Sequence, residues 1–280
     1  MTDRRIPAVL SIAGSDSGGG AGIQADLKAF ARCGVHGMTA ITALTAQNTA
    51  GVSAVHATPP DMIVEQVRQV AADLGVDAVK IGMLGTAETV GAVREALGLL
   101  APGTPIVIDP VMVAESGAVL LDDAARAALV EQLLPLATVI TPNLPEARVL
   151  AAGGDADGED LARALHRLGP RAVVVTGGHR EEVVDVFFDG ETVETLSGPR
   201  HADGAAHGSG CTHSSALAAH LALGHTPLEA ARAARAIASA AVRDGLRELG
   251  HGAGPVDVFG LRHRAPLGAP DPRHATAPLA

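Results

Sequence analysis

Short runs of β-branched residues alternate along this chain with longer runs rich in alanine and leucine. The short runs have the length of buried strands, and the longer runs repeat apolar residues at helical spacing. We predict strands at Ala8–Ile12, Met38–Ala43, Ala78–Ile81, Ile106–Ile108, Thr138–Ile140 and Ala172–Val175. We predict helices at Ile23–Arg32, Asp61–Asp73, Ala87–Leu100, Asp122–Leu134, Leu144–Ala151, Glu159–Leu168, Thr212–Leu223 and Leu228–Leu249. This alternation favours an α/β fold in which helices cover both faces of a mostly parallel sheet.

The pattern changes in the last third of the chain. Val183–Phe188 and Thr192–Leu196, joined by an Asp-Gly pair, predict an antiparallel hairpin. Neither an internal repeat nor a linker divides residues 1–264, so we expect a single domain there. Residues 265–280 are rich in Ala, Pro and Gly, which predicts a disordered C-terminal tail.

Composition excludes several classes of partner. The net charge is −10, Trp and Tyr are absent, and no basic run follows Arg4-Arg5, so we expect no nucleic-acid partner. No run reaches the ~18 apolar residues of a transmembrane helix, so we expect no membrane partner. Cys33 and Cys211 are too few for a disulfide framework, which favours a location in the reducing cytoplasm.

The segment His207-Gly208-Ser209-Gly210-Cys211-Thr212-His213 immediately precedes a predicted helix. Glycines and a helix N-terminus together predict an anion site, and phosphate is the usual guest. A thiol at such a position tends to have a lowered pKa, so Cys211 is a candidate base. Two alternatives use the same residues: a zinc site, for which a fourth ligand is lacking, and a Cys–His hydrolase.

Other polar and glycine-rich segments come directly after predicted strands. They are Gly14-Ser15-Asp16, Gln47-Asn48, Gly82-Met83, Asp109-Pro110, Thr141-Pro142-Asn143 and Thr176-Gly177-Gly178. Ligands bind at the carboxyl ends of the strands in an open parallel sheet, so these segments are expected to converge on one site. The plainer interpretation is that Gly, Pro and Asn only turn the chain.

The glycine-rich loop after the first strand matches the dinucleotide fingerprint at Gly20-x-Gly22-x-x-Ala25. That motif needs an acidic residue at the end of the second strand, where this chain has Gln47, so NAD binding is disfavoured. We instead expect a substrate loop with Asp26 and Gln47 as polar contacts. An amide both donates and accepts hydrogen bonds, so Gln47 suits a heteroaromatic ring that bears an amino group.

Two carboxylates are candidates for a nucleotide or metal site. Asp109 follows a very apolar strand and would face phosphates or a metal, or would cap a turn. Asn143 and Glu146 have the spacing of a helix capping box, and Glu146 would alternatively help hold Mg²⁺ through water. Both interpretations stay open. Because no Gly-Lys-Ser/Thr occurs, an ATP-using chain of this sequence is not a P-loop enzyme.

Taken in order, these motifs closely resemble those of the hydroxymethylpyrimidine/phosphomethylpyrimidine kinases of thiamine biosynthesis, in the ribokinase-like superfamily. The matching segments are Ala13–Asp16 with Gly19–Asp26, Ala46–Thr49, Lys80–Leu84, Asp109–Met112, Thr141–Glu146, Gly177–His179 and His207–Thr212. The resemblance implies a three-layer α/β/α fold and a homodimer. It also implies two successive ATP-dependent phosphorylations of 4-amino-5-hydroxymethyl-2-methylpyrimidine, first to the monophosphate and then to the diphosphate.

The resemblance also assigns roles to residues. It implies that Gln47 and Asp26 contact the pyrimidine and that Gly14, Met83 and Val111 line its pocket. It places Asp109, Asn143, Glu146, Thr176 and Gly178 at MgATP, with Asp109 and Glu146 as the candidates for Mg²⁺, directly or through water. It makes Gly208, Ser209, Gly210 and Cys211 the anion hole, with Cys211 where most ribokinase-like sugar kinases have an aspartate base.

The chain departs from the family at two cationic positions. Some members have lysine at the position of Thr176, and many have one in the stretch Ala114–Gly117. Neutralisation of the negative charge on the nucleotide phosphates should therefore depend more on Mg²⁺ or on an arginine. The alternatives are a pyridoxal or pyridoxine kinase of the same fold and a non-catalytic pyrimidine-binding protein. Gln47 and the Gln24-Ala25-Asp26 segment favour the pyrimidine.

Overall fold

The computed structural model describes residues 6–114, 117–177, 183–202 and 204–264, so the predicted tail lies outside the described residues. One nine-stranded sheet has the order β3-β2-β1-β4-β5-β6-β7-β8-β9. The strands are β1 (Ala8–Asp16), β2 (His36–Gln47), β3 (Val52–Ala57), β4 (Ala78–Ile81), β5 (Ile106–Ile108), β6 (Val139–Ile140), β7 (Ala172–Val175), β8 (Val183–Phe188) and β9 (Val193–Gly198).

The sheet is mostly parallel, as predicted. The central strands β2, β1, β4, β5, β6 and β7 pair in parallel, and β8 and β9 form the predicted antiparallel hairpin. Sequence reasoning missed β3, which pairs antiparallel with β2 at the sheet edge. Its side chains are largely exposed, so it lacks the apolar run that marks a buried strand.

The helices follow the predicted order. They are α1 (Gly22–Cys33), α2 (Pro60–Asp73), α3 (Ala87–Leu97), α4 (Asp123–Ala128), α5 (Leu144–Ala151), α6 (Gly158–His166), α7 (Ser209–Ala222) and α8 (Pro227–Arg243). A π turn (Leu129–Leu133) and two 3₁₀ turns (Leu134–Leu136 and Leu261–His263) complete the set. The prediction for α8 was six residues too long, because the chain turns at Gly245, which packs against Ala205. Of the helices that the structure describes, none is both long and apolar enough to cross a membrane.

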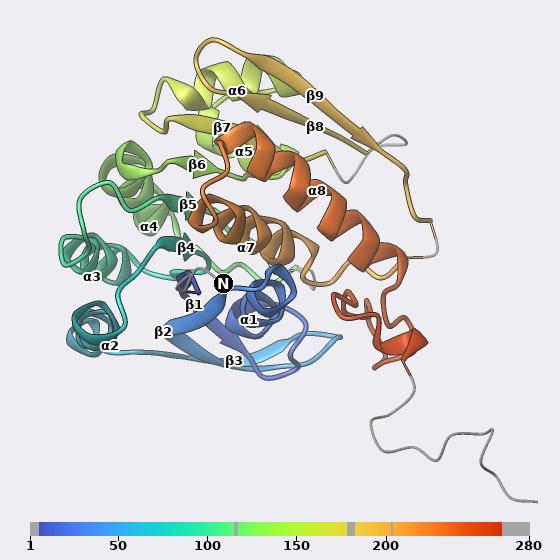
Figure 1. Ribbon diagram of the computed structural model, residues 1–280, viewed down its shortest axis with the longest axis horizontal. Coiled ribbons are helices and arrows are strands. Elements are labelled where there is room, and N and C mark those ends of the chain that lie inside the picture. The colour runs from blue at the N-terminus through green and yellow to red at the C-terminus, as the bar shows by residue number, and fades with distance from the viewer. Residues whose placement is uncertain (1–5, 115–116, 178–182, 203, 265–280) are drawn as a thin grey trace, which may run out of the picture.

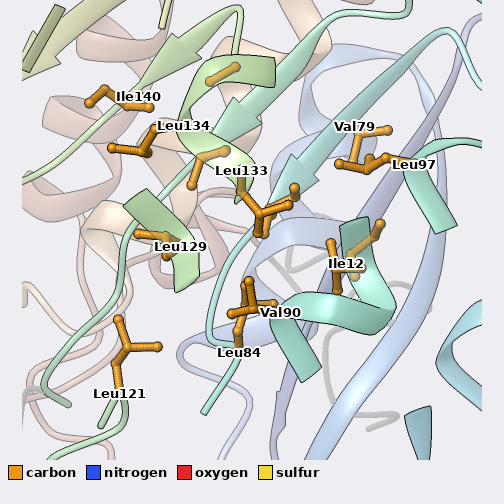
Figure 2. Packing of buried hydrophobic residues seen from close by; sticks show 14 of the residues in the cluster. Ile12, Val79, Leu84, Val90, Leu97, Leu121, Leu129, Leu133, Leu134 and Ile140 are labelled. Carbon is orange, nitrogen blue, oxygen red and sulfur yellow. The ribbon is translucent and has the colours of Figure 1, made fainter. Parts of the chain in front are cut away.

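Helices cover both faces of the sheet and give three layers (Figure 1). Helices α2 to α6 pack on one face around an aliphatic cluster that includes Ile12, Val90 and Leu133 (Figure 2). Helices α1, α7 and α8 pack on the other face, where Phe30 and the alanines of α7 and α8 are buried. Small side chains let α7 and α8 lie close to the sheet, and the N-terminus of α7 thereby reaches the carboxyl ends of the central strands.

Candidate active site

A cavity of about 440 Å³ lies at the carboxyl edge of the parallel strands. The last residues of β1 and β2 and the segments that follow β4, β5, β6 and β7 line it, so the predicted convergence is present. Of the predicted site residues, the cavity is lined by Gly14, Gln47, Met83, Asp109, Val111, Asn143, Glu146, Thr176, Gly208, Ser209, Gly210 and Cys211. The predicted contact Gly178 lies outside the described residues.

The predicted anion hole is the first turn of α7. The helix begins at Ser209, and Gly208 caps it with a φ of 84°, a conformation that side chains with a Cβ rarely adopt. A Cβ at Gly208 would also collide with the carbonyl oxygen of Gly20. The first N–H groups of a helix have no intrahelical acceptor, and here they border the cavity beside the carboxylate of Asp109. This turn is therefore suited to hold a phosphate oxygen.

Burial raises the pKa of the Cys211 thiol to about 12. The nearby Lys80 ammonium favours the thiolate, but Asp26 and Asp109 disfavour it. The expectation of a lowered thiol pKa was therefore wrong for the unliganded protein, because the helix N-terminus does not offset desolvation and two carboxylates. Cys211 is protonated at neutral pH.

The structure gives no support to the two alternative interpretations of this segment. His207 pairs with Asp16 rather than with the thiol, and the ring nitrogens of His213 have no partner among the described residues. A Cys–His hydrolase would need one of these histidines to hydrogen bond Cys211. Within the described ranges, no group of three His, Cys, Asp or Glu side chains is arranged to hold a metal ion, so the zinc alternative lacks a ligand set.

Asp26 is fully buried and does not line the cavity. Its carboxylate accepts hydrogen bonds from Ser11 Oγ (2.5 Å), Ser215 Oγ (2.7 Å) and Lys80 Nζ (2.9 Å). The expected contact between Asp26 and the pyrimidine is therefore corrected, because neighbouring side chains use the carboxylate behind the cavity wall. Its role in this structure is to hold Lys80.

Lys80 is the residue that sequence reasoning left without a role. Its side chain is fully buried, and Nζ lies 2.9 Å from Asp26 Oδ1 and 3.9 Å from Asp109 Oδ2. Burial alone would lower the pKa of Lys80, but the charges of Asp26, Cys211 and Asp109 outweigh it and raise the pKa. Lys80 therefore supplies a fixed positive charge beneath the anion hole. The signal in the sequence was one charged residue in the otherwise apolar strand β4.

The capping interpretation of Asn143 and Glu146 is confirmed. Glu146 N–H donates to Asn143 Oδ1 (2.8 Å), and Asn143 N–H donates to Glu146 Oε2 (2.9 Å). The backbone N–H of Met112 also donates to Glu146 Oε1 at 3.4 Å. These bonds position the Glu146 carboxyl group at the cavity wall, so the cap and a role in the site are compatible.

The carboxyl groups of Asp109 and Glu146 carry the electrostatic signature of a shared site. Burial raises the pKa of Glu146 to about 8, and the charge of Asp109 adds to the rise. Burial also raises the pKa of Asp109, against the influence of Lys80 and a hydrogen bond from Ser214 Oγ (3.0 Å). Two carboxyl groups that resist ionisation fit a divalent cation, which would stabilise both charges.

The glycine-rich loop after β1 is tied to the anion hole by Asp16 and His207. Asp16 accepts hydrogen bonds from the N–H groups of Gly18 (2.8 Å), Gly20 (3.0 Å) and Ala21 (2.8 Å). His207 Nε2 lies 3.2 Å from Asp16 Oδ2. Burial would raise the pKa of Asp16, but these hydrogen bonds outweigh it and lower the pKa. The pair fixes the two loops relative to each other.

The two ends of the cavity differ in chemistry. One end has Gly14, over which Met83 packs, and the amide of Gln47. The other end contains the ion pair of Arg235 Nη1 with Asp185 Oδ2 (3.0 Å), and exposed Arg200. Sequence reasoning did not identify these two arginines, because nothing in their local sequence marks them. They are the cationic residues at the end opposite Gln47.

A family model described as phosphomethylpyrimidine kinase matches residues 16–257. The chain belongs to the phosphomethylpyrimidine kinase family. It is 50% identical over 257 residues to the hydroxymethylpyrimidine/phosphomethylpyrimidine kinase of Rhizobium meliloti, a match that covers 89% of this chain and 96% of the relative. The kinase assignment therefore rests on similarity along nearly the whole chain.

Solved structures confirm the predicted ribokinase-like fold. The phosphomethylpyrimidine kinase of Clostridium difficile is 38% identical with a TM-score of 0.73, and covers 84% of this chain and 98% of its own. The pyridoxal kinase of Staphylococcus aureus in complex with ADP is 34% identical with a TM-score of 0.84, and covers 93% of this chain and 96% of its own. The fold alone therefore does not choose between the two kinase activities.

Proposed function

We propose that this kinase transfers the γ-phosphoryl group of ATP to the hydroxymethyl group of 4-amino-5-hydroxymethyl-2-methylpyrimidine, and then phosphorylates the monophosphate to the diphosphate. The product serves thiamine biosynthesis. The observation that carries the proposal is the cavity itself: one end with the amide of Gln47 and one end with the guanidinium of Arg235 meet at the N-terminus of α7. The high identity to hydroxymethylpyrimidine/phosphomethylpyrimidine kinases supports the choice of substrate.

The end of the cavity at Gln47 suits the pyrimidine. Gln47 Oε1 lies 3.2 Å from Thr45 Oγ1, which orients the amide at the cavity wall. A planar ring would lie between Met83 and Val111, with Gly14 allowing close approach to the backbone. The amide of Gln47 would then pair with the amino group and a ring nitrogen.

The anion hole would position the transferring phosphoryl group. The hydroxymethyl oxygen attacks the γ-phosphorus, the bond to the β–γ bridging oxygen breaks, and ADP leaves. Such a transition state needs positioning and charge stabilisation more than covalent help. Because the Cys211 thiol has a pKa of about 12, we assign it to the wall of the hole rather than to a preformed base. The hydroxyl proton leaves late, once the alcohol oxygen has become acidic, and passes to an oxygen of the transferred phosphoryl group.

Asp109 and Glu146 would hold Mg²⁺, directly or through water. Magnesium takes one or two protein carboxylates and completes its shell with waters and phosphate oxygens. The raised pKa values of both groups and their place beside the anion hole support this assignment. The ion would neutralise phosphate charge in place of the lysines that other family members have near the nucleotide and this chain lacks.

We also propose a homodimer formed through the β2–β3 edge of the sheet. Among the strands that the structure describes, β3 pairs only with β2, so its other edge offers backbone groups to a further strand. Two large apolar side chains of this edge are about half exposed, Leu44 (51%) on one face of the β2–β3 ribbon and Val55 (54%) on the other. A second copy of the chain would cover this apolar edge.

Pyridoxal kinase activity is the second candidate, because the Staphylococcus aureus pyridoxal kinase has the higher TM-score of the two solved structures compared. The test measures ATP turnover with hydroxymethylpyrimidine, its monophosphate and pyridoxal side by side. We expect the highest kcat/KM with the pyrimidines. A higher kcat/KM with pyridoxal would reverse the assignment, and no turnover with any acceptor would support a non-catalytic pyrimidine-binding protein.

A further inference from the structure

The charged end of the cavity is an arm enclosed by β8, α7, α8 and the segment before α7. We call it the α8 arm, and its lining includes Asp185, His201, His213, Arg235, Ser239 and Val242. Two contacts hold its polar groups in place. Arg235 pairs with Asp185, and His201 Nε2 lies 3.0 Å from Ser239 Oγ.

His213 is the unexplained group of this arm. Its side chain is only 4% exposed, and neither ring nitrogen has a hydrogen-bond partner among the described residues. Buried polar groups in folded proteins are nearly always hydrogen bonded, so each exception needs a reason. The two nitrogens of a neutral imidazole can both hydrogen bond a ligand only if that ligand offers one acceptor and one donor.

The surroundings of His213 keep its ring neutral. Burial lowers the pKa of His213, Arg235 lowers it further, and Asp185 only partly opposes them. One nitrogen of a neutral imidazole donates and the other accepts. A neutral ring suits the hydroxyl, amino and ring-nitrogen groups of a nucleoside better than it suits a phosphate, for which a cation is preferred.

The position of His213 on α7 separates it from the phosphoryl-transfer centre. It is two residues beyond Cys211, so the two side chains project from the helix about 200° apart. Cys211 is near Lys80 and Asp109, whereas His213 is near Asp185 of β8 and Arg235 of α8. The acceptor end and the anion hole therefore lie on one side of His213, and the α8 arm lies on the other.

We propose that His213 is a nucleoside-recognition residue that hydrogen bonds the base or ribose of ATP in the α8 arm. This inference rests on the proposed ATP-dependent function, which places the acceptor at Gln47 and the phosphates at the anion hole. The α8 arm is then the part of the cavity left for the nucleoside. Its apolar lining of Ala238 and Val242 beside polar groups is typical of a pocket for a heteroaromatic ligand.

The first test compares ADP binding by calorimetry in the wild type, His213→Leu and His220→Leu. His220 is a matched control, because it is on the same helix, has a buried ring nitrogen without a partner among the described residues, and does not line the cavity. We expect His213→Leu to weaken ADP binding roughly 5- to 50-fold, the loss of one or two neutral hydrogen bonds. His220→Leu should bind ADP as the wild type does. Equal affinities in all three proteins would overturn the inference.

A second measurement separates nucleoside from phosphate contacts. Inorganic tripolyphosphate lacks a nucleoside, so His213→Leu should bind it as tightly as the wild type does. His213→Asn, which keeps a donor and an acceptor, should restore part of the ADP affinity. In steady-state assays the KM for ATP should rise while kcat and the KM for the pyrimidine stay within about twofold.

These outcomes separate a failure of the proposed kinase function from a failure of the proposed role of His213. A wild type that neither binds ADP nor phosphorylates the pyrimidine would overturn both the proposed function and the role of His213. A wild type that does both, with an unchanged His213→Leu variant, would overturn the role of His213 alone. An equal loss of tripolyphosphate and ADP affinity in His213→Leu would show a phosphate contact and also contradict the inference.

Discussion

Lys80 and Asp26 form a fully buried ion pair, with 2.9 Å between Nζ and Oδ1, in which Lys80 lines the active-site cavity and Asp26 lies behind it. The pair holds an ammonium group beneath the anion hole, where Asp109 Oδ2 is the next carboxylate oxygen at 3.9 Å. A fixed cation at this place lets two carboxyl groups and an incoming phosphate occupy a small volume. The site depends on this buried charge as much as on the other residues that line the cavity.

Lys80→Met should destabilise the protein by about 3–5 kcal/mol, because it leaves Asp26 buried without its cation. The same change should abolish most of the kinase activity. Lys28→Met is the matched control, because Lys28 is the other lysine of the chain and its ammonium donates a hydrogen bond to the carbonyl oxygen of Gly19 rather than to a buried carboxylate. Urea unfolding of both variants tests the account, and similar unfolding free energies for the two would refute it.

Glu146 should make the stability of the magnesium-free protein depend on pH. Its folded pKa of about 8 lies above the ordinary value of 4.5, so the folded state binds the proton more tightly. The stabilisation is then complete below pH 4.5 and is lost as the pH rises toward 8. In EDTA, the unfolding free energy of the wild type should fall over this range more than that of Glu146→Gln. Parallel pH profiles for the two proteins would contradict the assignment.

Cys211→Ala should slow both phosphorylation steps by similar factors of less than about tenfold. A general base contributes ~10²–10⁴-fold, and it would be needed only for the hydroxyl acceptor. If Cys211 shapes the anion hole, the rates of the two steps fall by the same factor, since both steps use the same hole. The rates are measured separately with hydroxymethylpyrimidine and with its monophosphate. A loss above about 100-fold confined to the first step would instead identify Cys211 as the base.

Val55→Asp should convert the proposed homodimer into a monomer, because it places a charge on β3, the strand at the edge of the sheet, where a second copy would pack. Val149→Asp is the control, since Val149 is similarly exposed (48%) on α5, away from this edge. Light scattering after size-exclusion chromatography gives the mass of each variant. A dimeric Val55→Asp protein, or a monomeric wild type, would contradict the proposed interface.

Local patterns in the sequence predicted most of the architecture. Strand β4 and helix α5 have the predicted bounds, because an apolar run and a capping box define them locally. Strand β3 was missed because it is stabilised by pairing with β2 rather than by burial. Helix α8 was extended too far because its end depends on a packing contact between Gly245 and Ala205, which are forty residues apart in sequence.

The site was predicted as a set of residues, but its electrostatics was not. Loop motifs identified the part of the cavity lining that lies at the ends of the parallel strands, since residues there meet at one edge, but not the lining contributed by β8 and α8. The burial of Asp26 and the raised pKa of Cys211 depend on side chains from four separate elements. The proposed role of His213 likewise depends on Asp185 and Arg235, which are near it in the fold but distant in sequence. Charge and burial at this site are properties of the assembled fold.

The stoichiometry of phosphoryl transfer tests the central claim most directly. The wild-type protein is incubated with excess ATP, magnesium and a limiting amount of 4-amino-5-hydroxymethyl-2-methylpyrimidine, and the ADP and pyrimidine products are measured over time. The account predicts that the monophosphate appears and is then consumed, with two ADP released for each diphosphate formed. Formation of no phosphorylated pyrimidine, or a reaction that stops at the monophosphate with one ADP, would contradict it.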